Sequence, residues 1–326
     1  LQRNGVTVLL ITHKLDEIMA ITDTVSVMRH GEIVGHRRTA DTSPAELARL
    51  MVGRDVLLSV DRGSAQPGEV LLEVSGLSCT SSRGSKVLSD ISFDVRSGEI
   101  FGIAGVSGNG QTELLEVIAG MRKLEAGSVM LLGETITASA PKTPAQIRDM
   151  RIAHIPEDRH QFGLILSFDA KGNAILGYHK SADYGSGYFL DETAVATHCN
   201  KLMSDHDVRP GNPALLARNF SGGNQQKLVI ARETDINPKI LFVGQPTRGV
   251  DVGAIVFFHR QLLALRDAGC AILLVSAELD EIIGLSDRIM VMNDGRQMGI
   301  LDSADAGRDR LGTMMAGIVE TEAAAT

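Results

Sequence analysis

Residues 219–233 read NFSGGNQQKLVIARE and form the stretch around which the chain is organised. Ser221, Gly222 and Gly223 precede an amphipathic helix that we expect from about Gln225. The start of a helix exposes unpaired N–H groups and the positive end of the helix dipole. Small residues there let an anion approach closely. A helix N-cap followed by a flexible turn accounts for the tripeptide SGG equally well, so the neighbouring sequence has to decide between the two.

Two further stretches support a phosphate site. Residues 240–243 (ILFV) form a short apolar run, which is typical of a buried parallel strand, and PTRGVD follows at 246–251. Upstream, GVSGNGQT at 105–112 is a glycine-rich loop between a strand expected over 99–104 and a helix expected over 113–119. Backbone amides of such a loop can surround a phosphate group.

In this order and spacing, the three stretches resemble the ATP-binding subunit of ABC transporters. NFSGGNQ is similar to the signature motif of that family, ILFVGQPTRGVD to the Walker B strand with its D-loop, and GVSGNGQT to the Walker A loop. The form SGGNQQK…QPTRGVDVGA resembles importers of simple sugars and nucleosides that carry two ATPase domains in one polypeptide. The glutamine of QPTRG favours the nucleoside branch.

The resemblance implies an α/β fold of the P-loop NTPase type. We expect a mixed sheet core, an antiparallel β subdomain and a helical signature subdomain. Strands are expected near 100–104, 240–243 and 271–275, and alternation with helices predicts that they are parallel. Period-two alternation predicts antiparallel strands over 70–74 and 91–95.

Composition sets limits on the possible functions. With 44% hydrophobic and 22% charged residues, the 326-residue chain is typical of a globular protein. A net charge of −8 argues against a nucleic-acid partner. Cys79, Cys199 and Cys270 lack metal-ligand spacing, so we expect reduced thiols, and we interpret His198 and His206 with Cys199 as solvated helix residues. No apolar run reaches the ~18 residues of a membrane span, so any membrane role requires a partner subunit.

The chain contains a repeat of domain size. VTVLLITHKLDEI at 6–18 returns as CAILLVSAELDEI at 270–282, an offset of 264 residues. We therefore expect residues 1–54 to be the C-terminal remnant of a first ATPase domain, with a strand over 6–12. The expected divisions of the chain are a remnant at 1–54, a linker at 55–68, a second ATPase domain at 69–317 with its helical subdomain at about 155–235, and a flexible tail at 318–326.

The resemblance also implies the site residues, with ATP and Mg²⁺ as cofactors. Glu157 occupies the position of the Q-loop glutamine. Thr112 matches the magnesium-ligand position of the pattern G-x-x-x-x-G-K-[ST], although only weakly. The expected ATP-binding residues are Gly105, Ser107, Gly108, Asn109, Gly110, Gln111, Thr112, Glu113, Glu157, Ser221, Gly222, Gly223, Gln225 and Asp251.

Four positions depart from the family pattern. Gln111 stands where the Walker A lysine is expected, and Gly244 where the magnesium-binding aspartate is expected. Gln245 replaces the catalytic glutamate and has no titratable carboxylate to act as a general base. The switch histidine of the first copy, His13, aligns with Ala277 of the second. Together the four replacements predict a degenerate catalytic site in the second copy.

The resemblance implies that ATP lies between two ATPase domains arranged head to tail. The second copy would then present Ser221, Gly222 and Gly223 to ATP held by the first. The expected partners are transmembrane permease subunits, an extracytoplasmic substrate-binding protein and an ATPase domain of the same or a second chain, with no nucleic acid. We expect a peripheral protein on the cytoplasmic face of the inner membrane, and a chain that is inactive by itself. Two alternatives are an ABC ATPase acting on ribosomes or DNA, and a regulatory module that binds nucleotide without turnover.

Overall fold

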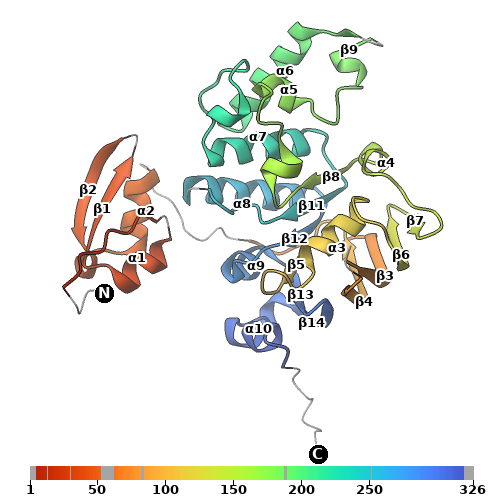
Figure 1. Ribbon diagram of the computed structural model, residues 1–326, viewed down its shortest axis with the longest axis horizontal. Coiled ribbons are helices and arrows are strands. Elements are labelled where there is room, and N and C mark those ends of the chain that lie inside the picture. The colour runs from red at the N-terminus through yellow and green to blue at the C-terminus, as the bar shows by residue number, and fades with distance from the viewer. Residues whose placement is uncertain are drawn as a thin grey trace, which may run out of the picture.

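The computed structural model describes residues 5–12, 14–29, 31–52, 62–81, 84–186, 189–250 and 252–318. Ten of the described strands form one sheet in the order β7-β6-β3-β4-β14-β13-β5-β12-β11-β8 (Figure 1). The strands at one end of this sheet are parallel, namely β5 (Ile100–Ala104), β12 (Ala271–Val275), β11 (Ile240–Gly244) and the edge strand β8 (Ile152–Ile155). Every residue of β5, β11 and β12 is buried, as their continuous apolar runs predict. The predicted α/β fold and its three parallel strands are confirmed.

An antiparallel part continues the sheet on one side. It contains β3 (Val70–Thr80), β4 (Lys86–Arg96), β6 (Ala126–Leu131) and β7 (Glu134–Thr137). β13 (Arg288–Asn293) lies parallel to β5 and antiparallel to β14 (Arg296–Asp302). A pairing of Ser89 with Arg296 joins β4 to β14. The predicted antiparallel part is therefore present, and its first two strands extend beyond the predicted 70–74 and 91–95.

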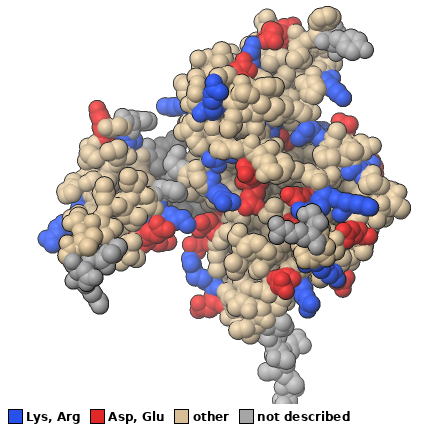
Figure 2. All heavy atoms as spheres, viewed as in Figure 1, with Lys and Arg blue, Asp and Glu red and all other residues tan. Residues whose placement is uncertain are grey.

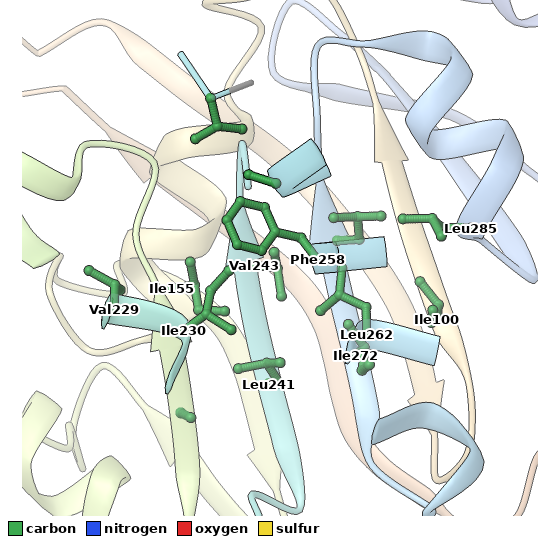
Figure 3. Packing of buried hydrophobic residues seen from close by; sticks show 14 of the residues in the cluster. Ile100, Ile155, Val229, Ile230, Leu241, Val243, Phe258, Leu262, Ile272 and Leu285 are labelled. Carbon is green, nitrogen blue, oxygen red and sulfur yellow. The ribbon is translucent and has the colours of Figure 1, made fainter. Parts of the chain in front are cut away.

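Helices cover the parallel strands and build a lobe above them in Figure 1. The helices near the sheet are α3 (Gln111–Ile118), α4 (Pro144–Asp149), α8 (Val252–Asp267), α9 (Leu279–Leu285) and α10 (Arg308–Met315). The upper lobe holds α5 (Ala170–Ala174), α6 (Glu192–Asp205), α7 (Gly222–Asp235) and the short strands β9 (Gly185–Ser186) and β10 (Phe189–Leu190). Val229 and Ile230 of α7 and Phe258 of α8 pack with Leu241 and Val243 of β11 (Figure 3). This shared core fixes α7, and with it the SGG stretch, over the end of the sheet.

The N-terminal elements repeat the C-terminal ones in structure as well as in sequence. They are α1 (Leu15–Ile21), β1 (Thr24–Arg29), β2 (Glu32–Arg38) and α2 (Pro44–Val52), drawn as a separate lobe in Figure 1. At the offset of 264 residues they correspond to α9, β13, β14 and α10. Even the bulge recurs, between Val27 and Met28 in one copy and between Val291 and Met292 in the other. Conservation of such detail shows that both segments are copies of one structural unit.

The two copies differ in what lies beside them. β13 has four buried residues, because β5 pairs with the edge of β13 that does not pair with β14. In β1 only Val27 is buried. The strand predicted over 6–12 is not formed, and Leu9 and Ile11 are about nine-tenths exposed, at 89% and 92%. A strand needs a neighbour to accept and donate ladder hydrogen bonds, and no described strand pairs with this segment. This prediction was wrong for the described structure.

Candidate functional site

The glycine-rich loop lies at the carboxyl end of β5, where ligands bind in open parallel sheets. Gly108 and Gly110 have left-handed φ values of +91° and +100°. A Cβ on Gly110 would also lie 2.9 Å from the carbonyl oxygen of Val87. Ser107 and Gly108 are exposed, and Asn109 is half-buried. α3 begins directly after Gly110 and is preceded by no side-chain cap, so its first N–H groups face the loop.

The side chain of Gln111 does not take over the role of the missing lysine, because it points into its own loop. Its side chain is buried, and Nε2 donates to the carbonyl oxygen of Val106, 3.1 Å away. An ideal Cβ on Gly105 would lie 2.1 Å from that nitrogen, so the amide fills the space that glycine leaves. The loop therefore closes on a neutral amide, and Gln111 adds no positive charge for phosphate.

Glu157 fills the space where the sequence pattern would place an aspartate. A Cβ on Gly244 would lie 2.9 Å from the backbone nitrogen of Glu157. The Glu157 carboxylate accepts a hydrogen bond from Thr112 Oγ1 at 2.6 Å and pairs with Arg248 Nη1 at 3.0 Å. A hydroxyl and a carboxylate are the hard oxygen ligands that Mg²⁺ prefers. Thr112 and Glu157 therefore fit a magnesium site in chemistry, although Gly244 offers no carboxylate at the position of the expected aspartate.

The other two positions that depart from the family pattern lie together. Gln245 Oε1 accepts a hydrogen bond from the backbone N–H of Ala277, 3.0 Å away. Gln245 has a φ of +47° and donates its own N–H to the carbonyl oxygen of Val275. The turn after β11 thus brings the catalytic-glutamate position to the switch-histidine position, with a neutral amide and a methyl group in place of a base and an imidazole.

The SGG stretch forms a helix start, as predicted, but three residues earlier than expected. α7 begins at Gly222 instead of Gln225, because Ser221 caps the N–H of Asn224 and the two low-propensity glycines form the first turn. Ser221 is exposed. Gln225 is buried and binds His160 Nε2 and the carbonyl oxygen of Ala217. Among the described residues, no hydrogen bond joins Ser221–Gly223 to the glycine-rich loop of the same chain.

The remaining predicted residues differ in how far they are exposed. His13 and Asp251 lie outside the described residues. Thr112 is exposed and Glu113 is half-buried. Cys199 is fully buried rather than solvated, because α6 turns it towards the core, and burial raises the pKa of its thiol to about 12. Within the described part of the chain no group of three His, Cys, Asp or Glu side chains could hold a metal ion.

Two arginines were missed by the sequence prediction. Arg159 Nη1 donates to the carbonyl oxygen of Arg248 at 3.0 Å, and its Nε donates to Gln225 Oε1 at 3.3 Å. Arg248 is the partner of Glu157. Both arginines stand inside stretches already singled out, PEDR and PTRG, and that position is the only signal the sequence offers.

Charged side chains of both signs are distributed over the visible face of the molecule. Figure 2 shows basic and acidic side chains interspersed, without a broad patch of one charge. None of the helices in the described ranges is long and apolar enough to span a membrane.

Comparison with known proteins identifies relatives along almost the whole chain. The sequence profile of the ABC transporter family matches residues 88–248. The chain is 44% identical over 97% of its length to the nucleoside import ATP-binding protein NupA of Lactococcus lactis subsp. cremoris (strain MG1363), and covers 62% of that protein. It is 43% identical over 93% of its length to the guanosine import ATP-binding protein NupO of Bacillus subtilis (strain 168), covering 59%. It is 38% identical over 97% of its length to the ribose import ATP-binding protein RbsA of Bacillus licheniformis (strain ATCC 14580), covering 62%.

The chain thus spans less than two thirds of the length of these relatives. Among solved structures, a nucleotide-free ATP-binding cassette from an ABC transporter superposes with a TM-score of 0.62 at 22% identity. The superposition covers 77% of this chain and 98% of the chain in that structure. At this identity the likeness establishes the fold, which is the fold of an ABC ATPase.

Proposed function

We propose that the chain contains an ATPase domain of the ABC transporter family and is part of the ATP-binding protein of an importer for a nucleoside or a simple sugar. The relatives are named for nucleoside, guanosine and ribose import. A nucleoside is the favoured substrate, in agreement with the glutamine of QPTRG. The partners would be transmembrane permeases and an extracytoplasmic binding protein, with this chain at the cytoplasmic face of the membrane.

We propose further that residues 69–317 form a cassette that has lost hydrolysis and kept its signature. One observation carries this proposal: Gln111 is folded into its own loop while Ser221 caps an intact helix start. The glycine-rich loop would still bind the phosphates of ATP, and Thr112 with Glu157 would hold Mg²⁺, which when bound offsets phosphate charge. Gln245 and Ala277 supply no general base. The start of α7 would then serve ATP held by another cassette.

Residues 1–54 would be the end of that other cassette, with His13 as its switch histidine. The repeated elements support this proposal, and so does one contact between the copies. Lys14 Nζ lies 3.1 Å from Glu278 Oε1, and the two residues are 264 positions apart, so equivalent positions of the two copies touch. Contact between equivalent positions is what a pseudo-twofold arrangement produces.

The test is steady-state ATPase activity of the full-length protein assembled with its permease. Ser221→Arg places a bulky cation where a γ-phosphate must pack against small groups. Loss of one preorganised contact costs roughly 10²–10³ in rate, and a blocked interface costs at least as much. Ser181→Arg is the matched control, because Ser181 is also a serine N-cap but lies outside the signature stretch. Full activity of the Ser221→Arg protein would falsify the composite site.

A second variant tests the degenerate site. Gln245→Glu alone should create no turnover in this 326-residue chain, because Gly244 and Ala277 would still provide neither a carboxylate nor an imidazole. By itself the chain should therefore behave as a nucleotide-binding module without hydrolysis. Strong turnover by the unaltered chain would refute this assignment.

A further inference from the structure

The last helices of the two copies, α2 and α10, pack in the same way on the strands of their own copy. An ideal Cβ on Gly35 of β2 would lie 3.0 Å from Leu50 Cδ1 of α2. The equivalent residues, 264 positions later, are Gly299 of β14 and Met314 of α10, and there the corresponding distance to Met314 Cε is 2.9 Å. A difference between the outer faces of α2 and α10 therefore reflects what lies beyond each copy.

The outer faces differ at one pair of equivalent positions, Ala48 of α2 and Gly312 of α10. Ala48 is fully buried. Gly312 is exposed, and no neighbouring segment lies within 4 Å of an ideal Cβ at this position. α2 lies against α8 of the second copy, whereas α10 packs on β13 and β14 of its own copy. The outer face of α2 is thus covered by the other copy, and the equivalent face of α10 is open.

The contact between Lys14 and Glu278 relates these two faces to each other. The two residues are equivalent positions, and Lys14 Nζ lies 3.1 Å from Glu278 Oε1. Equivalent positions meet near the axis of a pseudo-twofold arrangement, and such an axis repeats every contact between the copies in the opposite sense. The contact of α2 with α8 therefore implies a second contact, between α10 and the helix of the first cassette that corresponds to α8.

We propose that the face of α10 around Gly312 is the docking surface for that helix, which follows the D-loop of the first cassette. Each cassette then holds the other through its C-terminal helix. Glycine suits this position, because a residue without a side chain lets another backbone approach closely. The inference rests on the proposed function, since it takes the first cassette to be a whole ATPase domain of the same protein.

The first test measures how fast a maleimide modifies one introduced cysteine. Gly312→Cys should react rapidly in the 326-residue chain, and at least about tenfold more slowly in the full-length protein, where modification would need local opening. Ala48→Cys should react slowly in both proteins, because α8 already covers this position. The native Cys79, Cys199 and Cys270 are buried and give only a slow background.

Gly284→Cys and Ala20→Cys are the matched controls, because Gly284 and Ala20 are equivalent helical positions that are exposed in both copies. Each should react rapidly in the 326-residue chain and in the full-length protein. Equal rates for Gly312→Cys in the two proteins would overturn the docking surface.

The second test identifies what covers Gly312. A maleimide–benzophenone probe is attached to Gly312→Cys in the full-length protein assembled with its permease, and the cross-linked peptides are mapped after photolysis. We expect the main cross-link on the helix that follows the D-loop of the first cassette. Cross-links to the permease or to a second copy of the protein, or none at all, would contradict the proposed occupant. Neither test involves hydrolysis or the signature, so a failure here is distinct from a failure of the Ser221→Arg ATPase test.

Discussion

At the scale of single residues, two of the positions that depart from the family pattern, Gln111 and Gly244, are closely fitted to a neighbouring residue. Gln111 folds into space left by Gly105, and Glu157 approaches space left by Gly244. Each pair is complementary, because the larger side chain or the backbone occupies the volume that a Cβ would need. Restoring one member of a pair without the other therefore creates a steric conflict, and this has a measurable consequence.

Gly244→Ala should destabilise the fold by about 1–3 kcal/mol, the usual cost of overpacking. Its Cβ would lie 2.9 Å from a backbone nitrogen and 3.3 Å from a backbone Cα, neither of which can rotate away. Gly284→Ala is the control, because Gly284 lies in α9 with no atom within 4 Å of an ideal Cβ, and should stabilise by about 0.5–1 kcal/mol. Urea unfolding measures both, and equal stabilities would contradict the proposed fit.

His154 should make stability depend on pH. Burial lowers the pKa of His154 from 6.5 to about 4. Between these values the unfolded chain binds a proton that the folded chain does not, so stability falls as pH decreases from 6.5 to 4. Between pH 6.5 and 4, the free energy of unfolding should fall by roughly 2–3 kcal/mol more in the unaltered chain than in His154→Gln, because glutamine does not titrate. Parallel stability curves for the two proteins over this pH range would disprove the assignment.

At the scale of elements, α7 joins the two layers of the molecule at both of its ends. Its first turn contacts Arg159, and near its last turn Arg232 and Glu233 form a buried ion pair at 2.7 Å. Glu233 Oε2 also accepts from Tyr178 and from the backbone N–H of His154 on β8. Both members of the pair are buried and hydrogen-bonded. Removing one of the two charges should therefore cost more stability than removing both.

Glu233→Ala should destabilise the chain by about 3–5 kcal/mol, because it leaves the buried guanidinium of Arg232 unpaired. Arg232→Met combined with Glu233→Leu should cost less than that single change, since it removes both charges and keeps the volume. Thermal or denaturant unfolding compares them. A double variant less stable than Glu233→Ala would show that the pair acts through something other than its charge.

The same elements show how far sequence reasoning reaches. The apolar run at 240–243 indicated β11, the glycine-rich loop that follows 99–104 indicated β5, and the repeat at 270–282 contains β12. The apolar run at 6–12 forms no strand, because a strand needs a neighbouring strand that its own sequence does not specify. The start of α7 was placed three residues late because glycine is a weak helix former. The orientation of the Gln111 side chain and the short distance between Gly244 and Glu157 depend on atomic positions in three dimensions. The spacing of sequence motifs does not specify these positions.

At the scale of the whole molecule, the segment 62–68 behaves as a part of the large domain. We predicted it as linker because of its glycines and proline, yet Arg62 donates to the backbone of Ser286 and to Ser303 Oγ. Arg266 in turn donates to the carbonyl oxygen of Arg62, and Gly68 donates to that of Ser97. These partners lie up to 241 positions away in sequence, beyond the reach of local composition.

Limited proteolysis should reflect this attachment. Proteinase K should not cut within 62–68 of the unaltered chain, and should cut there in Arg62→Ala, which loses the contacts with Ser286 and Ser303. Arg209→Ala is a suitable control, because it removes a surface pair with Asp207 elsewhere. Mass mapping of the fragments gives the answer. Early cleavage within 62–68 of the unaltered chain would show that the attachment does not hold in solution.

The central claim is that this cassette presents its signature to a nucleotide that another cassette hydrolyses. Vanadate trapping of azido-ATP in the full-length protein, followed by photolabelling and peptide mapping, tests it most directly, because trapping requires turnover. We predict trapped label in the first domain, and loss of that label by at least 100-fold in Ser221→Arg. Trapped label in the domain that contains Gly105–Thr112, or undiminished trapping in Ser221→Arg, would contradict the account.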